Sequence, residues 1–409
     1  MHPKELLISD FTYSLPQERI AGFPLPKRDE SKLIHYRNGI ITESIYRNLA
    51  LFIPAGSLLI FNDTKVIEAR LLFRKSAGSI IEIFCLEPHP QYKDITTAMA
   101  EKECVRWICL IGGASKWKKG QVLEKKITTQ HVEITLQAKY IEKINEAFVI
   151  ELSWKPVQLP FAEILHEMGS IPLPPYIKRA ALKEDAERYQ TIYAKTDGSV
   201  ASPTAGLHFT PAIFSSLQEK KIIKEFVTLH VGAGTFKPIK ENRVGLHIMH
   251  SEYIDIPVSA IKTILKNCTT GITCVGTTSL RTIESLYWLG VKTILFPAIS
   301  TESLRVLQWD PYELPVVAIS ASEALESLLN WLKKNNKERL ITTTQLLVAP
   351  GYPFKIVQGL ITNFHQPNST LLLLVAAFIG EEWKRIYKYA LENNFRFLSY
   401  GDGCLLQRH

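Results

Sequence analysis

The pattern of hydrophobic residues changes twice along this chain, and each change constrains the fold. Between about residues 67 and 152, short β-patterned runs recur at Ile80–Leu86, Val105–Ile111, His131–Ala138 and Phe148–Leu152. Apolar and polar residues alternate in His131–Ala138, and successive side chains of a strand point to opposite faces, so this run predicts a half-buried strand. Several such runs separated by turn signals predict a small barrel or sandwich.

From about residue 153 the pattern is typical of an α/β protein. Strands are expected at Lys224–His230 and Gly271–Gly276, and a helix with one apolar face at Thr278–Gly290. Thr210 before Pro211 predicts an N-cap followed by a proline at the first helical position. Alternating strands and helices predict a mostly parallel sheet.

A chain of 409 residues is too long for one ordinary core, so we expect two domains. We predict an α/β domain formed by residues 1–66 and 153–409, and a smaller all-β domain, a barrel or a sandwich, formed by residues 67–152. Residues 291–345 hold six basic and six acidic residues, so this block is neutral although the whole chain is basic, and a surface helix pair is expected there. The longest apolar run, Leu371–Ile379, is too short to span a bilayer and predicts a buried helix, which Ser369 can cap.

The net charge of +8 allows a polyanionic partner, although a basic surface without one is equally compatible with it. The six cysteines form no C-x-x-C pair, so neither a zinc site nor a disulfide framework is indicated. The first residues contain no signal-peptide hydrophobic region. We therefore expect a cytoplasmic protein without a membrane partner, and a monomer.

Four of the eleven histidines lie between residues 201 and 253: His208, His230, His247 and His250. Their neighbours are Gly, Ser, Thr or Glu, which is the composition of a polar pocket. The spacing of His247, His250 and Glu252 would permit a metal. No second cluster completes such a site, so hydrogen bonding or proton transfer is the favoured interpretation, with a structural histidine as the alternative.

Two segments are candidate anion sites. The glycines in the run Gly232-Ala233-Gly234 could cradle a nucleotide or a carboxylate, although a tight turn is the alternative and the run is not a dinucleotide fingerprint. Thr277-Thr278-Ser279 opens a helix after a strand, and Arg281 adds a bidentate donor. Simple helix capping is the alternative there.

Other polar segments permit two interpretations each. Asn363–His365 precedes Ser369 at a strand-to-helix junction. Asp402 could hold a cationic amine or could form a turn. Ile171–Arg179 is a rigid extended segment ending in two cations, which could contact RNA or form a surface strap. The loop Lys116–Gly120 makes the β-module locally basic, with an aromatic residue between the lysines.

Together these segments resemble one family, the S-adenosylmethionine:tRNA ribosyltransferase-isomerases of queuosine biosynthesis. The resemblance covers about residues 5–290 and 348–405 and follows the family's order. The matching segments are S-L-P-Q-E-R-I-A, F-P-L-P-K-R-D, F-N-D-T-K-V-I-E-A-R, I-P-L-P-P-Y-I-K-R, Y-Q-T-I-Y-A, S-P-T-A-G-L-H-F-T, L-H-V-G-A-G-T-F, M-H-S-E-Y, V-G-T-T-S-L-R-T-I-E-S, P-G-Y-P-F-K, L-I-T-N-F-H-Q-P-N-S-T and S-Y-G-D.

The resemblance implies an α/β main domain with an inserted β-barrel. It implies transfer and isomerisation of the ribosyl part of S-adenosylmethionine onto 7-aminomethyl-7-deazaguanine at the wobble position of a tRNA. Adenine and methionine leave, epoxyqueuosine forms, and no metal takes part. The sulfonium acidifies the neighbouring ribose C5′ position, adenine needs a proton to leave and the aminomethyl nitrogen must lose one, so several proton carriers are needed.

We expect these roles to fall on residues of the matching segments. The predicted catalytic residues are His208, His230, His250 and Glu252. The predicted S-adenosylmethionine-binding residues are Gly232, Gly234, Thr235, Thr277, Thr278, Ser279, Arg281, Asn363 and His365, with Arg281 and Ser279 on the methionine carboxylate. The predicted tRNA-substrate residues are Asp63, Lys65, Tyr176, Lys178, Arg179, Tyr400 and Asp402, and Lys116, Lys118 and Lys119 are expected on tRNA phosphates.

The chain departs from the family pattern at several places. The acidic residue that commonly precedes P-G-Y is absent, the ending S-Y-G-D-G-C-L-L is slightly altered, and residues 291–345 exceed the family's usual length, so an extra insertion is expected there. Gln366 stands where the family usually has an apolar residue, and Asn368 where it has a lysine. A paralogue with an altered substrate is therefore an alternative, as is a tRNA-binding protein that has lost catalysis. A methyltransferase is a third reading, and the absence of a glycine-rich dinucleotide-type turn disfavours it.

Overall fold

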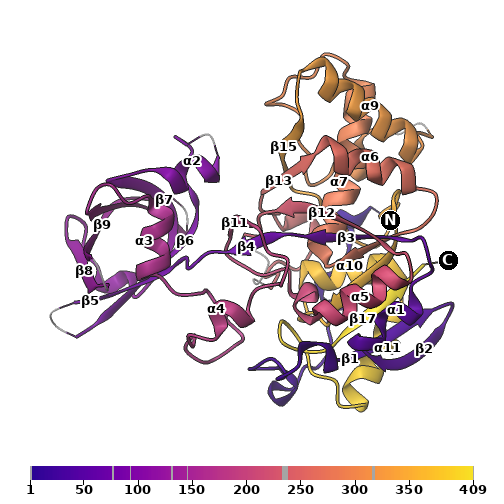
Figure 1. The fold of residues 1–409 in the computed structure, drawn as a ribbon, viewed down its shortest axis with the longest axis horizontal. Helices are drawn as coiled ribbons and strands as arrows, with labels where there is room; N and C mark the ends of the chain where they lie inside the picture. The colour runs from indigo at the N-terminus through magenta and orange to yellow at the C-terminus, as the bar shows by residue number, and fades with distance from the viewer. Residues whose placement is uncertain are drawn as a thin grey trace.

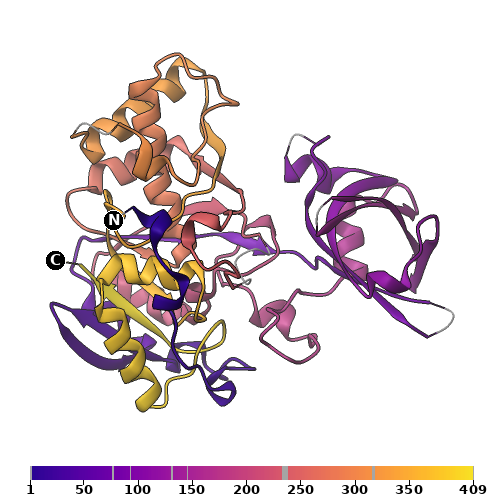
Figure 2. The same ribbon diagram turned by 180° about the vertical axis from the view of Figure 1, so that it is seen from behind.

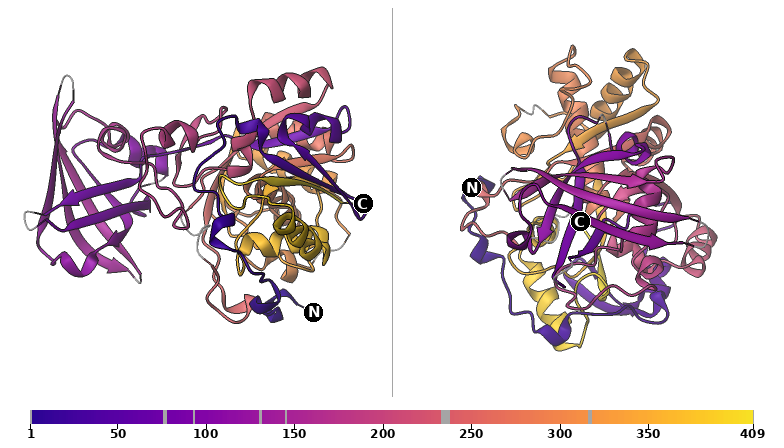
Figure 3. Two further views of the ribbon diagram at one scale, coloured as in Figure 1. Left: turned by 90° about the horizontal axis from the view of Figure 1, so that it is seen from below. Right: turned by 90° about the vertical axis from the view of Figure 1, so that its left-hand side faces the viewer.

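The computed structural model describes residues 2–75, 78–92, 94–129, 132–144, 146–232, 238–315 and 318–408. The chain forms an α/β body and a separate β-barrel (Figure 1). A narrow connector joins them, and it contains the parallel pair β4 (Thr64–Val66) and β11 (Thr196–Ser199). The barrel also stands apart from the body in the reverse view (Figure 2) and in the view from below (Figure 3, left).

The body is built on one sheet of nine described strands. Their order across the sheet is β15-β13-β12-β3-β14-β16-β17-β1-β2. The bounds are β15 Arg339–Thr344, β13 Glu252–Pro257, β12 Ile223–Leu229, β3 Leu58–Asn62, β14 Ile272–Val275, β16 Val357–Asn363, β17 Gly403–Gln407, β1 Lys32–Arg37 and β2 Ile40–Ile45.

This sheet is mixed, so the prediction of a mostly parallel sheet is right only for its centre. The neighbours β12, β3, β14 and β16 run parallel. Of the eight pairings between described strands, four are parallel and four antiparallel. Antiparallel neighbours at both sides, such as β13 and β17, need no crossover helix, which is why the helix-and-strand pattern did not reveal them.

Helices cover both faces of the sheet. On β3, Leu58 and Ile60 belong to the hydrophobic core on one face, while Leu59 and Phe61 belong to the core on the other. The helices of the first face are α6 Val258–Asn267, α7 Thr277–Leu295, α9 Ala321–Lys334, α10 Thr370–Ile379 and α11 Glu382–Glu392, and those of the second are α1 Leu49–Phe52 and α5 Pro211–Glu219. Two short helices are α4 Asp185–Arg188 and α8 Asp310–Glu313.

The predicted helix caps are confirmed. The Thr210 side chain accepts a hydrogen bond from the backbone N–H of Ile213, with Pro211 at the start of α5. Ser369 caps α10 in the same way through the N–H of Leu372. The apolar run therefore forms a buried helix as predicted, and in the described ranges no helix combines the length and hydrophobicity needed to cross a bilayer.

Helix α7 differs from its prediction. Leu280, Ile283 and Leu286 lie in the core as expected, but Thr282 and Ser285 on the other side of the helix are also fully buried. The helix contacts the central strands on one side and α9 on the other, so it has no solvent face over most of its length.

The 291–345 block does not form the expected surface helix pair. Its strand β15 pairs with β13 and extends the main sheet. In α9, Leu325 and Leu328 are fully buried against the core, and Leu340 of β15 is 2% exposed. The block therefore completes one end of the body.

The second described sheet is antiparallel throughout, with the order β5-β6-β7-β10-β9-β8. The bounds are β5 Arg70–Arg74, β6 Ile80–Pro88, β7 Cys104–Gly112, β8 Val122–Thr128, β9 Glu133–Ile144 and β10 Ala147–Lys155. Strands β5 and β8 contact each other, so the sheet curls into a nearly closed barrel. In β9, Ile134, Leu136 and Ala138 are buried as predicted, whereas Val132 precedes the strand and is exposed.

Two helices accompany the barrel: α2 (Ile95–Ala100) and α3 (Phe161–Met168). Phe161 of α3 packs between Trp107 and Trp154 of the barrel, with ring centroids 5.1 and 5.6 Å away. Gly169 ends α3, and a side chain there would lie 1.9 Å from the backbone oxygen of Glu68.

Candidate active site

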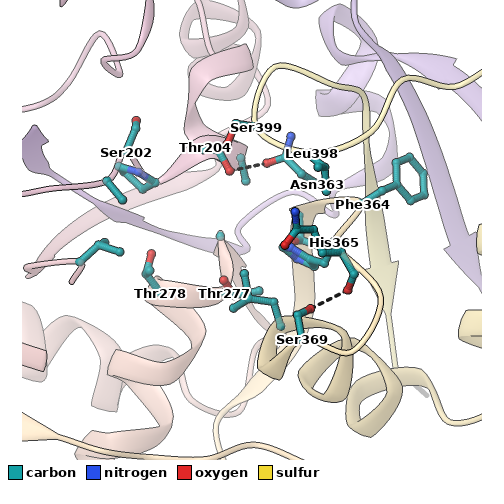
Figure 4. A pocket seen from close by; sticks show the side chains of 18 of the residues that line it. Ser202, Thr204, Thr277, Thr278, Asn363, Phe364, His365, Ser369, Leu398 and Ser399 are labelled. Atoms are coloured by element: carbon teal, nitrogen blue, oxygen red, sulfur yellow. Dashed lines mark hydrogen bonds between the residues drawn. The ribbon is translucent and has the colours of Figure 1, made fainter. Parts of the chain in front are cut away.

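A pocket, here called the first pocket, lies where β14 and β16 end and α7 and α10 begin (Figure 4). In α/β sheets, ligands bind outside the carboxyl ends of parallel strands. The described lining residues are Tyr176, Ala201, Ser202, Pro203, Thr204, Ala205, Val231, Gly276, Thr277, Thr278, Thr362, Asn363, Phe364, His365, Gln366, Ser369, Leu371, Leu398 and Ser399.

The N-terminus of α7 forms one wall of this pocket. Gly276 has φ +91°, which lets the chain turn directly from β14 into the helix. No described side chain caps this 19-residue helix, so its first N–H groups are available to an anion. Asn62, at the end of β3, donates to the hydroxyl of Thr278 at 3.3 Å and accepts from the N–H of Leu229 at 3.1 Å. The Asn62 side chain therefore links the end of β3 to the end of β12 and to the first turn of α7.

Asn363 forms the opposite wall and is 2% exposed. Its side-chain oxygen accepts from the Thr204 hydroxyl at 2.8 Å, and its nitrogen lies 3.3 Å from Nε2 of His208. Nδ1 of His208 lies 3.4 Å from the carbonyl oxygen of Arg28, which can only accept, so Nδ1 carries the proton and Nε2 accepts from Asn363. The His208 ring stacks on Tyr46 with centroids 4.0 Å apart.

Burial lowers the pKa of His208 to about 3, and it lowers the pKa of His365 to about 3 as well. Both rings are therefore neutral near pH 7. Nε2 of His365 lies 2.8 Å from the Thr362 hydroxyl, and the backbone N–H of His365 donates to the Tyr387 hydroxyl at 3.0 Å. His365 thus enters the first pocket as a fixed, neutral imidazole.

A second pocket adjoins the first, because Leu371 lines both. Its charged residues are Glu252 and Arg281, which form a buried ion pair between Oε2 and Nη1. The Nε of Arg281 donates to the carbonyl oxygen of Leu346 at 3.0 Å. Its Nη2 is buried and finds no hydrogen-bond partner in the described chain. The other lining residues are His247, Met249, His250, Leu347, Val348, Thr370 and Leu374.

The model of a family described as "Queuosine biosynthesis protein" matches residues 8–406 of the chain. A protein of Magnetococcus marinus is 36% identical over 98% of this chain and 93% of its own length. Proteins of Halothermothrix orenii and Pelobacter propionicus are 35% and 33% identical over 98% of this chain and 99% and 100% of their own lengths. All three are named S-adenosylmethionine:tRNA ribosyltransferase-isomerase.

The chain belongs to the S-adenosylmethionine:tRNA ribosyltransferase-isomerase family. It is an enzyme of queuosine biosynthesis, as the resemblance of its motifs predicted. A crystal structure of the S-adenosylmethionine tRNA ribosyltransferase of Thermotoga maritima is 27% identical over 97% of this chain and 99% of that chain, with a TM-score of 0.45.

In this member of the transferase-isomerase family, the predicted site residues fall into three groups. Thr277, Thr278, Asn363, His365 and Tyr176 meet in the first pocket. The second pocket brings together Glu252, Arg281 and His250. Gly232 follows the lining residue Val231, whereas Gly234 and Thr235 lie outside the described residues.

The third group lies outside the lining of both pockets. The Ser279 hydroxyl is fully buried and donates to the carbonyl oxygen of Val275 at 2.8 Å. The carboxylate of Asp402 accepts from the backbone N–H of Lys32 at 2.9 Å and of Arg396 at 2.8 Å. The geometry of Asp402 is therefore that of the turn-forming aspartate considered as its alternative.

Several of the predicted tRNA-substrate residues make contacts that stabilise the connector and the extended segment Ile171–Arg179. Arg179 makes a bidentate ion pair with Asp185 at 2.6 and 2.8 Å, and the Tyr400 hydroxyl donates to the same carboxylate at 2.9 Å. Lys178 beside them is exposed.

In the connector, Asp63 accepts from the Thr228 hydroxyl at 2.7 Å. Lys65 pairs with Asp197 at 3.1 Å on the β4–β11 ladder. Nδ1 of His230 lies 3.2 Å from the Thr64 hydroxyl, and burial lowers the pKa of His230.

Sequence reasoning missed the lining residues Ser202, Thr204, Thr362 and Ser399. Each lies inside a matching segment, so the signal was present, but only the fold shows that their side chains line a pocket. Among the described residues there is no group of three or more His, Cys, Asp or Glu that could hold a metal ion. Of the three residues whose spacing would permit a metal, His247, His250 and Glu252, His247 lies 3.5 Å from Glu241 and Glu252 pairs with Arg281.

Proposed function

We propose that this enzyme transfers and isomerises the ribosyl part of S-adenosylmethionine onto 7-aminomethyl-7-deazaguanine at the wobble position of tRNA. Adenine and methionine are released, and epoxyqueuosine-tRNA is formed. S-adenosylmethionine is consumed as a co-substrate. The proposal is supported by the relatives named S-adenosylmethionine:tRNA ribosyltransferase-isomerase, which align with nearly the whole chain.

One observation carries the proposal: three of the matching segments, far apart in the sequence, form a single pocket. Residues 202–205 come from S-P-T-A-G-L-H-F-T, residues 276–278 from V-G-T-T-S-L-R, and residues 362–366 with Ser369 from L-I-T-N-F-H-Q-P-N-S-T. The pocket combines an uncapped helix N-terminus with amide, hydroxyl and neutral imidazole groups. Such groups suit the ribose hydroxyls and heteroatoms of a nucleoside.

The two buried histidines take different parts in this proposal. His365 lines the pocket and, as a neutral ring, exchanges hydrogen bonds with the nucleoside. His208 does not line it, and both of its ring nitrogens are engaged. We therefore assign His208 the positioning of Asn363 rather than proton transfer. His250, in the second pocket, remains the proposed proton carrier.

The barrel is proposed to bind tRNA phosphates through an exposed basic loop. Lys116, Lys118 and Lys119 are exposed on this loop. Trp117 between them is 6% exposed and donates from Nε1 to the carbonyl oxygen of Gln121 at 2.8 Å. The aromatic residue therefore belongs to the barrel core, and the loop offers charge without a stacking platform.

The test is to mix the purified protein with S-adenosylmethionine and tRNA bearing 7-aminomethyl-7-deazaguanine. Adenine and methionine are quantified together with the mass of the modified nucleoside. Equimolar release with an epoxyqueuosine-sized gain supports the proposal. Bound tRNA without release would indicate a paralogue or a non-catalytic binder, and S-adenosylhomocysteine as the product would indicate a methyltransferase.

A further inference from the structure

The second pocket contains a buried guanidinium with one unpaired nitrogen. Arg281 is 6% exposed, and two of its nitrogens are occupied, Nη1 by Glu252 and Nε by the carbonyl oxygen of Leu346. Nη2 has no partner among the described residues although it is buried. An unpaired buried donor costs free energy, so the site is incomplete until an acceptor reaches it.

The charges around this nitrogen specify what can bind. Glu252 is 5% exposed and neutralises Arg281, so a single added charge of either sign would be left unbalanced in a buried site. The remaining titratable neighbours are His247, which lies 3.5 Å from Glu241, and His250. A ligand group that carries one positive and one negative charge satisfies both members of the pair and preserves neutrality.

The rest of the lining suits a short aliphatic chain. Leu346, Val348, Leu371 and Leu374 contribute apolar side chains to the same pocket. Such a wall accommodates methylene groups between two polar ends.

The second pocket lies about one helical turn further along α7 than the first pocket. Thr277 and Thr278 line the first pocket, and Arg281, four and three residues later, lines the second. Residues at this spacing share one helix face and are separated by about 4.5 to 6 Å along the axis. A ligand that extends along this face from the first pocket therefore reaches Arg281 through a chain of a few atoms.

We infer that the second pocket is the subsite for the α-amino-acid end of S-adenosylmethionine, bound as a zwitterion. Its carboxylate pairs with Nη2 of Arg281, and its ammonium group pairs with the carboxylate of Glu252. The inference rests on the proposed function, because it completes the site of the same co-substrate. It gives Glu252 a binding role in place of the catalytic role expected from the sequence.

The test compares two thioether ligands that differ by the amino-acid group. S-adenosylhomocysteine carries it, and 5′-methylthioadenosine lacks it. Calorimetry with the wild-type protein is expected to show roughly 10- to 100-fold tighter binding of S-adenosylhomocysteine, the value of one or two charge-assisted hydrogen bonds. Equal affinities would overturn the subsite. If S-adenosylmethionine and both analogues all failed to bind, the proposed function itself would fall.

Two variants test whether Arg281 and Glu252 cause the difference in affinity between the two ligands. Arg281→Lys keeps a positive charge for Glu252 but removes the unpaired nitrogen, and Glu252→Gln removes the negative charge. Each is expected to abolish most of the difference between the two ligands while 5′-methylthioadenosine binds as before. Arg339→Met is the matched control, because it breaks an exposed ion pair with Asp255 at 2.8 Å. If both pocket variants still bind S-adenosylhomocysteine more tightly than 5′-methylthioadenosine by the wild-type ratio, the amino-acid group binds elsewhere.

Discussion

The ring nitrogen Nε2 of His208 accepts a hydrogen bond from the side-chain amide of Asn363 at a distance of 3.3 Å. His208 is a core residue stacked on Tyr46, whereas Asn363 lines the first pocket. Since the other ring nitrogen is held by the carbonyl oxygen of Arg28, the histidine presents only an acceptor to the amide. This contact fixes which atom of Asn363 is the donor and leaves its oxygen to Thr204.

The first prediction concerns this contact. His208→Phe keeps an aromatic ring on Tyr46 but removes the acceptor, so kcat is expected to fall roughly 10-fold with a smaller change in KM. His208→Gln restores a side-chain acceptor and should recover most of the loss. Asn363→Ala should cost more than His208→Phe, and the double variant should lose less than the sum of the two. Additive losses would show that the residues act independently.

The second prediction is a loss of stability in mild acid. His208 and His365 have pKa values of about 3 in the folded protein, compared with the usual 6.5. Below about pH 6.5 the unfolded chain therefore binds more protons than the folded one, and the free energy of unfolding falls as the pH falls. The limiting slope is about 1.4 kcal/mol per pH unit for each histidine.

Urea unfolding at about pH 7 and about pH 5.5 measures this slope. Burial raises the pKa of Asp63, Glu87 and Glu284, and these carboxylates are present in every variant, so the histidine contribution is taken from the difference between variants. His208→Phe should reduce the pH dependence of the free energy of unfolding by up to about 1.4 kcal/mol per pH unit, the contribution of one histidine. The matched control is His166→Gln, since the His166 side chain is 71% exposed, and it should leave the slope unchanged. An equal reduction in the control would contradict the assignment.

The third prediction concerns Gln366, a half-buried residue of the first pocket. If the substrate is that of the family, the pocket works with an apolar residue at this position, so Gln366→Leu should change kcat/KM for S-adenosylmethionine by no more than about threefold. A change above tenfold, or acceptance of a different base in the tRNA, would favour the paralogue reading.

The fourth prediction concerns Asn368, whose backbone has φ +55°. Asparagine adopts this left-handed conformation more readily than lysine, so Asn368→Lys should destabilise the protein by about 1 kcal/mol. Asn368→Gly, which removes the steric conflict, should be tolerated. Thermal unfolding of both variants checks this, and a lysine variant as stable as the glycine variant would exclude backbone strain as the reason for the departure.

The fifth prediction concerns the lysine loop of the barrel. Replacing Lys116, Lys118 and Lys119 with alanine should weaken tRNA binding and reduce the slope of log K against log salt by roughly 2. The control replaces Lys262 and Lys266, two exposed lysines of α6 on the body. If the slope falls equally in both variants, or in neither, the loop is not a phosphate-binding site.

The sequence by itself determined the elements whose signals are local. The caps at Thr210 and Ser369 and the alternation in β9 depend on residues within one or two turns or along one strand, so periodicity and capping chemistry sufficed. The family could likewise be read from ordered motifs, because each is a contiguous run of residues.

Only the tertiary structure decided which polar residues face a pocket and which hold the fold. Ser279 and Asp402 belong to motifs as specific as those of Thr278 and Asn363, yet their oxygens are engaged by backbone groups. The partner of Arg281 is Glu252, 29 positions away, and its identity depends on how β13 meets α7. A side chain's availability depends on its neighbours in space, and a linear pattern does not contain that information.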